Sequence, residues 1–326
     1  MKKLRFGIVG TGVIAHRFAN AFKNIDFAEL TAVASRTKEN AEKFGDEFNI
    51  ENRFYSYEDM AKSDKIDVAY IAVPHSGHKS ASILMMQNGK SVLCEKPVAV
   101  NKKEAEEMFC CAEENNVFLM EAMWARLVPG TLKMLSMVKD GVLGEIKSVQ
   151  SQFCYNMDDE LDHHVFKNEN GGGSLLDVGV YCLNVCMWYL GKDVEKMHSF
   201  AELTNGTDTQ QSTIIKYKNG SLAEISSATL VQRENCGYIY GTKGYAYLRP
   251  SYAPYKIVLH LNGKEEETLD IPYGGNGFEH QIKHVCECIG KGLKTSPVNT
   301  PENTLFIMEQ MDGIRKDIGL CYPQDL

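Results

Sequence analysis

Two short segments of this chain carry side chains that can take part in proton transfer. In the first, Glu95-Lys96-Pro97 directly follows the apolar run SVLC, which is typical of a buried strand. Residues at the carboxyl ends of parallel strands face the ligand crevice of open α/β sheets. Charged residues are rarely buried unless they are paired. The residues alone therefore fit a surface salt bridge as well as a site for a reacting group.

The second segment reads GGGSLLDVGVY, from Gly171 to Tyr181. The glycine run gives a backbone that other groups can approach closely, and Ser174 is a candidate N-cap for the helix that follows. Asp177 and Tyr181 are spaced i, i+4, so a helix places them on one face. A carboxylate beside a phenol can orient it or change its pKa. The alternative is a capping carboxylate and a packed tyrosine.

A third feature is the turn Gly10-Thr11-Gly12-Val13-Ile14-Ala15, which has the form G-x-G-x-x-A. It follows an apolar run and opens an amphipathic segment, which is the context that a dinucleotide-binding turn requires. Gly10 permits the tight turn, Gly12 lets the backbone approach the pyrophosphate, and Ala15 allows close packing of helix on strand. The helix N-terminus then attracts the phosphates. We expect the cofactor to contact Gly10, Thr11, Gly12, Val13 and Ile14.

The end of the next apolar run indicates which nicotinamide cofactor the chain selects. A protein that selects NAD usually places Asp or Glu here to bind the ribose 2′-hydroxyl. This chain has Ser35, Arg36, Thr37 and Lys38, with no carboxylate. A hydroxyl and two cations suit a 2′-phosphate instead. We therefore expect NADP(H) to be preferred over NAD(H), although an ordinary basic surface loop has the same composition.

Strand-like and helix-like segments alternate through the first third of the chain. The strand-like runs are Leu4–Gly10, Leu30–Ser35, Asp67–Val73, Ser91–Glu95 and Val117–Glu121, and the helical patterns are Val13–Lys23, Lys38–Phe48, His78–Asn88 and Asn101–Asn115. Asn101 is a candidate N-cap with Glu104 in the capping-box position, and Gly89 is a candidate C-terminal cap. This alternation predicts βαβ units and a parallel sheet over residues 1–122.

After about Trp124 the pattern changes. Helical patterns occur at Pro129–Lys139, Leu175–Leu190, Phe278–Gly290 and Pro301–Ile318, and strand patterns at Ile146–Tyr155, Met197–Leu203, Ser212–Tyr217, Ser221–Leu230, Gly237–Gly241, Tyr245–Leu248 and Lys256–Leu261. Asn219-Gly220 and Asn262-Gly263 are hairpin signals. Sequential strands joined by tight turns predict an antiparallel sheet in a second domain, residues 123–326. We allow for its C-terminal helix packing back on the first domain.

Composition argues against several classes of function. The chain holds 35 Lys and Arg against 43 Asp and Glu, a net charge of −8, which disfavours nucleic acid or an anionic membrane surface as the main partner. No uninterrupted apolar stretch reaches the ~20 residues that span a bilayer, and the start has no secretory pattern. The 10 cysteines are scattered, and we interpret them as reduced thiols of a cytoplasmic protein.

No metal site is predicted. The segment Asp158–His164 has suitable ligand types but no defined zinc spacing, so a solvated loop is the favoured interpretation. Thiols in a helical core explain Cys110-Cys111 and Cys286-x-Cys288. A group of late tyrosines could line a sugar site or a subunit interface, with packing as the default: Tyr245, Tyr247, Tyr252, Tyr255 and Tyr273.

Taken together, these motifs resemble the Gfo/Idh/MocA oxidoreductases, also called the glucose–fructose oxidoreductase family. The resemblance covers nearly the whole chain and rests on GIVGTGVIA, the Ser35-Arg36 pair, VPHSGH, EKP and GGGSLLDVGVY, in family order. The segment EAMWAR (Glu121–Arg126) and the Ser35-Arg36 pair are similar to the branch of dimeric dihydrodiol dehydrogenases and NADP-dependent sugar dehydrogenases. Tyr181, in place of the histidine of inositol dehydrogenases, favours the same branch.

The resemblance implies a Rossmann domain, with a doubly wound parallel sheet, and an α/β domain with an open, mostly antiparallel sheet that commonly forms the dimer face. It implies an active site between the domains, with Lys96 beside the reacting hydroxyl, Tyr181 as the acid/base and Asp177 positioning the substrate or its proton. An ammonium lowers the pKa of a nearby phenol and stabilises oxyanion charge, and oxidation of an alcohol requires a base at its oxygen. The cofactor-side residues that the resemblance adds are Pro74, His75, His78, Glu95, Lys96, Trp124 and Arg126.

The sequence thus predicts an NADP(H)-dependent oxidoreductase acting on a secondary hydroxyl or carbonyl of a sugar, polyol or cyclic diol, as a homodimer or higher homo-oligomer. Two alternatives stay open: a nicotinamide-dependent glycosidase that uses transient oxidation, and a dinucleotide-sensing protein without turnover. The segment HHVFKNEN departs from the family, because His164 stands near the place where many relatives carry arginine. That departure leaves the substrate unassigned.

Overall fold

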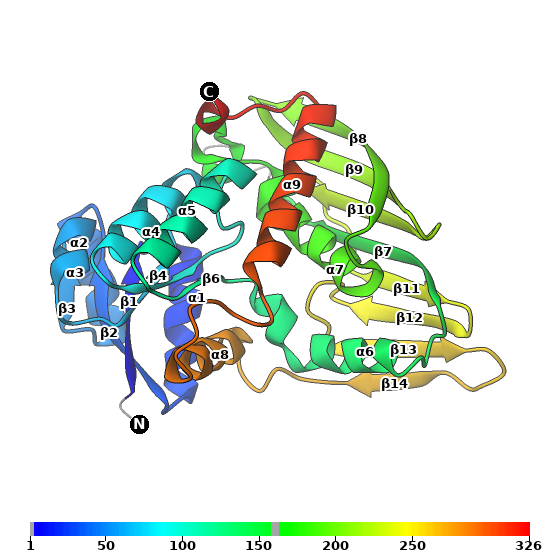
Figure 1. Ribbon diagram of the computed structural model, residues 1–326, viewed down its shortest axis with the longest axis horizontal. Helices are drawn as coiled ribbons and strands as arrows, with labels where there is room; N and C mark the ends of the chain where they lie inside the picture. The colour runs from blue at the N-terminus through cyan, green and yellow to red at the C-terminus, as the bar shows by residue number, and fades with distance from the viewer. Residues whose placement is uncertain (1–2, 158–162) are drawn as a thin grey trace. The chain divides into compact units, whose positions relative to one another are not determined.

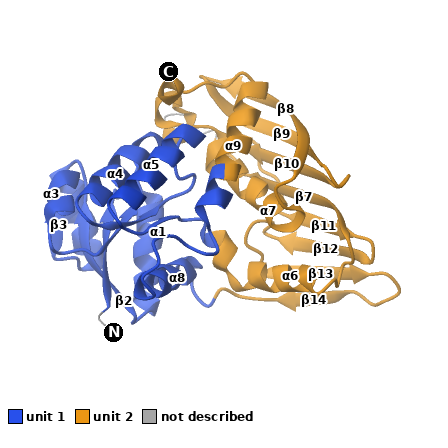
Figure 2. Ribbon diagram, viewed as in Figure 1, with its two compact units in different colours: residues 1–124, 274–305 blue, residues 125–273, 306–326 orange. Residues whose placement is uncertain are grey.

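The computed structural model describes residues 3–157 and 163–326, which divide into two units (Figure 2). The first unit comprises Met1–Trp124 and Gly274–Leu305, and the second comprises Ala125–Tyr273 and Phe306–Leu326. The chain thus leaves the first unit two residues after the predicted boundary at 122. It returns for residues 274–305, which the predicted ranges place in the second domain. The returning segment carries the helix α8 (Phe278–Gly290), whereas most of the last long helix, α9 (Pro301–Asp317), belongs to the second unit.

A six-stranded parallel sheet with the order β3-β2-β1-β4-β5-β6 forms the centre of the first unit. Its strands are β1 (Leu4–Val9), β2 (Ala28–Ala34), β3 (Asn52–Phe54), β4 (Val68–Ile71), β5 (Ser91–Cys94) and β6 (Leu119–Glu121). The connecting helices are α1 (Val13–Ala21), α2 (Lys38–Phe48), α3 (Tyr57–Lys62), α4 (His78–Gln87) and α5 (Lys102–Glu114). The strand order reverses between β1 and β4, which is the switch point of a doubly wound fold. The predicted parallel Rossmann sheet is confirmed.

The sequence missed β3 and α3, because these elements are short and polar and give no clear periodicity. Two predicted helix ends are confirmed. The Asn101 side chain accepts a hydrogen bond from the backbone N–H of Glu104 at 2.9 Å, as an N-cap does, and Gly89 follows α4 with φ +74°. The Glu104 carboxylate accepts from the backbone N–H of Val100, at 3.4 Å.

The second unit contains an eight-stranded sheet with the order β14-β13-β12-β11-β7-β10-β9-β8 (Figure 1). Its strands are β7 (Ile146–Cys154), β8 (Val194–Thr204), β9 (Thr207–Tyr217), β10 (Leu222–Ala228), β11 (Gly237–Gly241), β12 (Gly244–Arg249), β13 (Lys256–Leu261) and β14 (Glu267–Asp270). The pair β7–β10 is parallel and the other pairs are antiparallel. A mostly antiparallel sheet was predicted and is confirmed; the parallel pair and β14 were not predicted.

Helices α6 (Pro129–Lys139), α7 (Val180–Leu190) and α9 lie on one face of this sheet (Figure 1). Alternate residues of β8 to β10 face away from these helices, and among them Phe200 is 83% exposed and Ile214 and Leu222 are also exposed. The helical stretch Asn168–Leu190 is long and apolar enough to span a bilayer. Most of its apolar window is buried inside the protein, so it forms part of the core.

Candidate active site

The cofactor-side residues predicted in the first unit all follow strands of the parallel sheet, at their carboxyl ends. Gly10 follows β1, Ser35 follows β2, Pro74 comes shortly after β4, Glu95 follows β5, and Trp124 comes shortly after β6. Parallel strands present their carboxyl ends at one edge of the sheet, where ligands of this fold class bind. The topology therefore brings these residues to the same edge.

The glycine turn after β1 has the geometry that a dinucleotide phosphate requires. Gly10 has φ +104°, and a Cβ there would lie 2.4 Å from the carbonyl oxygen of Ala72. A Cβ on Gly12 would meet nothing within 4 Å, so the backbone there is open to a ligand. The N-cap residue of α1, Gly12, makes no side-chain cap, and Val13 in the first turn of this helix is 87% exposed. The residues present therefore fit the predicted pyrophosphate position.

The loop after β2 presents the cations predicted for the 2′-phosphate. Ser35 is buried, whereas Arg36 and Lys38 are exposed. The Lys38 ammonium lies 5.4 Å from the centre of the Tyr55 ring. Burial raises the pKa of Tyr57, while the charge of Arg36 acts in the opposite direction. The two cations thus lie near Tyr55, which follows β3, and Tyr57 of α3. The sequence did not indicate these tyrosines, because β3 and α3 were missed.

Glu95 is a buried carboxylate, 3% exposed, which excludes the surface salt bridge that its sequence position allowed. It accepts hydrogen bonds from the hydroxyl of Tyr70 and from the backbone N–H of Lys96, the latter at 3.1 Å. Burial raises the pKa of Glu95, and the positive charge of Lys96 opposes that rise. The Tyr70 ring is stacked on Phe18 of α1, with centroids 3.6 Å apart. Glu95 therefore holds the backbone at Lys96 to the core of the first unit.

A second buried carboxylate, Glu121 at the end of β6, supports the same loop. It accepts hydrogen bonds from the backbone N–H of Val98 at 3.1 Å and from the hydroxyl of Thr304 at 3.0 Å. Burial raises its pKa to about 7. From its sequence position, Glu121 was noted only as part of EAMWAR. The available signal was a carboxylate that ends an apolar strand, as Glu95 does.

His78 joins two loops of this edge. Its ring nitrogens lie 2.8 Å from the carbonyl oxygen of Pro97 and 3.0 Å from that of Val73. Burial lowers its pKa to about 4, so the ring is neutral at neutral pH. The His75 ring, also buried, lies 5.6 Å from the His78 ring. These contacts give His78 a role in positioning the loops after β4 and β5, and direct contact of either histidine with a cofactor stays a prediction.

Trp124 is part of an aromatic and cationic stack in the first unit. Its ring is stacked on Phe278 of α8, with centroids 5.4 Å apart. The Arg17 guanidinium lies 4.8 Å from the Trp124 ring centre and 4.9 Å from that of Phe278. Arg17 and Phe278 were not predicted as site residues, because no local signal links α1, β6 and a helix far along the chain.

In the second unit, the helix that carries Asp177 and Tyr181 begins differently from the prediction. Leu175–Gly179 is π-helical, and the α-helix begins only at Val180. Asp177 and Tyr181 were expected on one helical face because an α-helix was predicted over the whole segment. One carboxylate oxygen of Asp177 accepts a hydrogen bond from the hydroxyl of Tyr155, at 2.5 Å. Burial, followed by the charge of Asp177, raises the pKa of Tyr155, so Tyr155 keeps its proton and acts as a donor.

Tyr181 is buried within an aromatic cluster. Its ring centre lies 5.7 Å from that of Phe153 and 4.9 Å from that of Tyr252. Phe153 and Tyr252 are themselves stacked, with centroids 4.3 Å apart. The cluster joins α7, the end of β7 and the segment after β12, and it holds the phenol ring of Tyr181 in a defined orientation.

Asp208 of β9, rather than Ser174, caps the start of this helix. One oxygen of Asp208 accepts hydrogen bonds from the Ser174 hydroxyl and from the backbone N–H of Leu175, both at 2.7 Å. The predicted Ser174 cap is therefore wrong: Ser174 has helical backbone angles and makes no side-chain cap. Burial raises the pKa of Asp208 to about 7. A Cβ on Gly173 would lie 2.1 Å from the other Asp208 oxygen, which explains the last glycine of the run.

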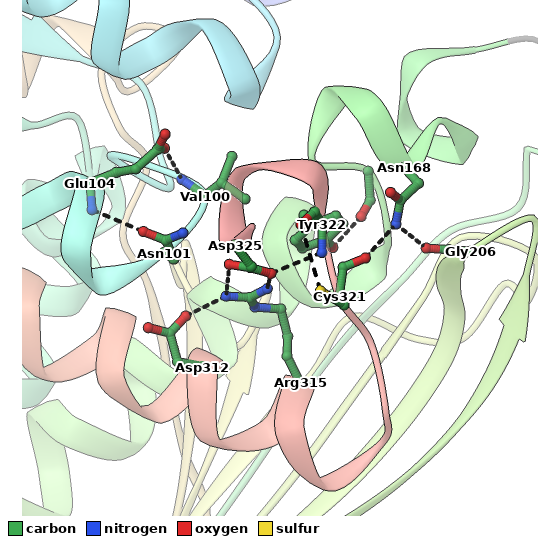
Figure 3. A network of polar contacts seen from close by, with 11 residues as sticks. Val100, Asn101, Glu104, Asn168, Gly206, Asp312, Arg315, Cys321, Tyr322 and Asp325 are labelled. Carbon is green, nitrogen blue, oxygen red and sulfur yellow. Dashed lines mark hydrogen bonds and ion pairs between the residues drawn. The ribbon is translucent and has the colours of Figure 1, made fainter.

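The last residues of the chain also contact the glycine segment that precedes Asp177 (Figure 3). The Tyr322 hydroxyl donates to the carbonyl oxygen of Gly172, and the Asn168 amide donates to that of Cys321 at 2.9 Å. The buried guanidinium of Arg315 pairs with Asp312 and Asp325, each at 2.6 Å. Contacts from β9, from α9 and from the last residues of the chain thus hold the segment that precedes Asp177.

Arg126 carries a spare hydrogen-bond donor. Its guanidinium lies 6.0 Å from the ring centre of Trp188. One of its terminal nitrogens is buried and has no hydrogen-bond partner among the residues that the structure describes. Burial lowers its pKa. A spare buried donor fits the predicted contact with a ligand, because an unpaired buried donor is costly unless a bound group satisfies it.

The remaining candidates give no further site. Asp158 to Asp162 lie outside the described residues, and the rings of His163 and His164 lie 4.0 Å apart. Within residues 3–157 and 163–326 no group of three metal-ligating side chains is found. Cys111 and Cys288 are buried as predicted, whereas Cys110 is exposed, so the core interpretation is wrong for that thiol.

Both units match protein-family models. Residues 4–123 match the oxidoreductase family with an NAD-binding Rossmann fold, and residues 131–247 match the GFO/IDH/MocA C-terminal domain. The trans-1,2-dihydrobenzene-1,2-diol dehydrogenase of Mus musculus is 34% identical over 333 residues, covering 99% of each chain. The Homo sapiens enzyme of the same name is 33% identical over 334 residues, with the same coverage.

Solved structures agree with this fold. KijD10, a 3-ketoreductase from Actinomadura kijaniata whose structure contains NADP and TDP-benzene, superposes with a TM-score of 0.89 at 24% identity. The superposition covers 97% of this chain and 98% of that chain. At this identity the likeness supports the fold alone.

Proposed function

The chain belongs to the Gfo/Idh/MocA family of NAD(P)-dependent oxidoreductases, and we propose that it transfers hydride between NADP(H) and a secondary hydroxyl or carbonyl of a sugar, polyol or cyclic diol. The observation that carries this proposal is the position of Lys96, which lies at the same sheet edge as the dinucleotide turn and is supported by two buried carboxylates. The similarity to dihydrodiol dehydrogenases supports the substrate class.

The residues that would hold the cofactor are those of the sheet edge. The backbone from Gly10 to Ile14 would bind the pyrophosphate, and Ser35, Arg36 and Lys38 would bind the 2′-phosphate. Toward the nicotinamide end we place Pro74, His75, Trp124 and the spare donor of Arg126. When bound, the nicotinamide supplies or accepts the hydride.

We assign the proton transfer to Tyr181, with Lys96 as its electrostatic partner. In the oxidation direction the phenolate of Tyr181 takes the proton of the reacting hydroxyl, and the ammonium of Lys96 stabilises negative charge on the oxygen. Asp177, held by Tyr155, orients the substrate or its proton. The aromatic neighbours of Tyr181, Phe153 and Tyr252, limit the motion of its ring.

We also propose that two copies of the chain associate through the outer face of the eight-stranded sheet. Phe200, Ile214 and Leu222 expose apolar surface there. Apolar side chains on a sheet face are typical of an interface between subunits.

The test of the function is a pair of substitutions, Lys96→Met and Tyr181→Phe. Each is expected to lower turnover by roughly two to four orders of magnitude, the usual contribution of acid–base catalysis, while NADP still raises the melting temperature. Near-native turnover in both variants would remove this mechanism. Cleavage of an aryl glycoside without net change in nicotinamide absorbance would favour the glycosidase instead. Tight NADPH binding without activity on a broad polyol panel would favour the sensor.

A further inference from the structure

A cavity of about 670 Å³ opens in the second unit, between the segment that follows β10 and the segment that follows β12. The residues that matter for its chemistry are Arg233, Glu234, Asn235, Arg249, Tyr252 and Tyr255. Apart from Tyr252, which neighbours Tyr181, none of them has a role in the function proposed above. The cavity combines cations with aromatic surfaces, although the chain as a whole has a net charge of −8.

The wall that carries Arg233 is fixed to the sheet by hydrogen bonds on either side of that residue. The backbone N–H of Cys154 donates to the Asn235 side chain at 2.9 Å, and the Gln152 amide donates to the carbonyl oxygen of Glu234 at 2.8 Å. The backbone N–H of Ser251 donates to the carbonyl oxygen of Asn235 at 3.2 Å, which joins the two segments. The cavity is therefore formed before any ligand binds.

The charges in the cavity leave one cation in excess. The Arg249 guanidinium lies 3.7 Å from the Glu234 carboxylate, which also accepts a hydrogen bond from the Tyr247 hydroxyl at 2.6 Å. Arg233 has no carboxylate within ion-pairing distance among the residues that the structure describes. Its five N–H donors are arranged as a planar fork that matches a carboxylate or a phosphate.

The cavity shares a wall with the aromatic cluster around Tyr181. Tyr252 lines the cavity and is also stacked on Phe153, with its ring centre 4.9 Å from that of Tyr181. Burial raises the pKa of Cys154, the residue next to Phe153, and the charge of Arg233 opposes that rise. Arg233 and Tyr181 are therefore both near the end of β7, where Tyr181 contacts Phe153.

We propose that this cavity binds an anionic group of the substrate, a carboxylate or a phosphate monoester, so that the substrate is a sugar acid or a sugar phosphate. The inference rests on the proposed function and narrows its substrate class. Arg233 pairs with the anion, and Tyr252 packs against the carbon skeleton between the anion and the reacting hydroxyl. A placed charged group beside an aromatic surface fixes the orientation of a bound ligand.

The test compares three probes on the NADP-loaded protein: glucose, glucuronate and glucose 6-phosphate. Calorimetry measures their binding, and nicotinamide absorbance measures their turnover. At least one anionic probe is expected to bind about tenfold or more tightly than glucose, as a charge-assisted hydrogen bond allows. The anion that is preferred identifies carboxylate or phosphate as the group recognised. Equal binding of all three probes would overturn the inference.

Three variants test whether Arg233 causes the preference for an anionic probe over glucose. In Arg233→Gln the affinities for the anionic probe and for glucose are expected to become nearly equal. Arg233→Lys is expected to keep most of the preference for the anionic probe. Lys264→Gln, which removes an exposed charge at the β13–β14 turn, should leave the ratio as it is. A preference that survives in Arg233→Gln would overturn the proposal. If the probes bind with the expected ratio but neither they nor any compound of the broad polyol panel is turned over, the proposed function fails and the anion site stands.

Discussion

The hydroxyl of Tyr155 donates a hydrogen bond to a carboxylate oxygen of Asp177, at 2.5 Å. Tyr155 directly follows β7, and Asp177 lies in the π-helical turn that leads to Tyr181. π-Helical turns occur often at functional sites. The contact means that Asp177 is oriented by a half-buried donor, and it makes Tyr155 a positioning residue for the proposed reaction.

Replacing Tyr155 by phenylalanine should therefore reduce turnover more than it reduces NADP binding. Loss of a hydrogen bond to a charged group is worth about 1.5–3 kcal/mol, which corresponds to roughly ten- to hundredfold in rate. Steady-state kinetics and NADP titration measure the two effects. Tyr217→Phe is the matched control, because Tyr217 is a buried tyrosine of β9 with no side-chain hydrogen bond to another described residue. Equal turnover in the two variants would contradict the role.

Glu121 should make the protein less stable as pH rises. Burial raises its pKa from 4.5 to about 7, so between these values the folded chain holds a proton that the unfolded chain has lost. The free energy of unfolding therefore falls through this window, by about 3 kcal/mol for a shift of this size, and is constant above it.

Glu121→Gln should flatten this pH dependence in part, because Asp208 and Glu95 also have raised pKa values and contribute with the same sign. Denaturant unfolding at pH 5 and at pH 8 measures the change. If the free energy of unfolding changes equally between pH 5 and pH 8 in the variant and in the parent protein, Glu121 does not titrate as described.

Asp208→Ala should destabilise the second unit and slow the reaction. The substitution removes the acceptor of the Leu175 N–H, and a buried donor left unpaired costs about 1–3 kcal/mol. The Ser174 hydroxyl also loses Asp208 but keeps its contact with the hydroxyl of Ser227. Asp208→Asn keeps an acceptor oxygen and should recover most of the melting temperature. If alanine is tolerated as well as asparagine, the helix start does not depend on this carboxylate.

The two glycines of the dinucleotide turn should respond differently to alanine. Gly10→Ala forces a side chain against the Ala72 carbonyl at a positive φ, so the melting temperature should fall. Gly12→Ala points into open space and should leave the fold intact while weakening NADP binding by about tenfold or more. Unchanged NADP affinity in Gly12→Ala would show that the cofactor does not contact this turn.

Arg36→Ala should raise the KM for NADP by about tenfold and leave the KM for NAD nearly unchanged, since only NADP carries the 2′-phosphate. Lys43→Ala, which removes an exposed charge on α2, serves as the control for net charge. An unchanged KM for NADP in Arg36→Ala would show that the preference lies elsewhere.

Sequence patterns predicted most of the elements because their signals are local. Apolar runs of strand length, helical periodicity and the glycine spacing after β1 each lie within one short segment. The same is true of the Asn101 cap and of Gly89, which the structure confirms. The elements that were missed, β3, α3 and β14, are short and polar, so tertiary packing rather than local pattern decides that they form.

Local sequence patterns were enough to predict the fold class, the dinucleotide turn and the short list of reactive side chains. The surroundings of these side chains depend on tertiary contacts: Glu121 binds the loop after Lys96, Tyr155 binds Asp177, Asp208 replaces Ser174 as the cap, and Phe278 stacks on Trp124. Each of these contacts joins segments that are distant in the chain. Their partners are chosen by strand order and by the burial of polar groups that must find a hydrogen bond, and neither leaves a pattern in a single segment.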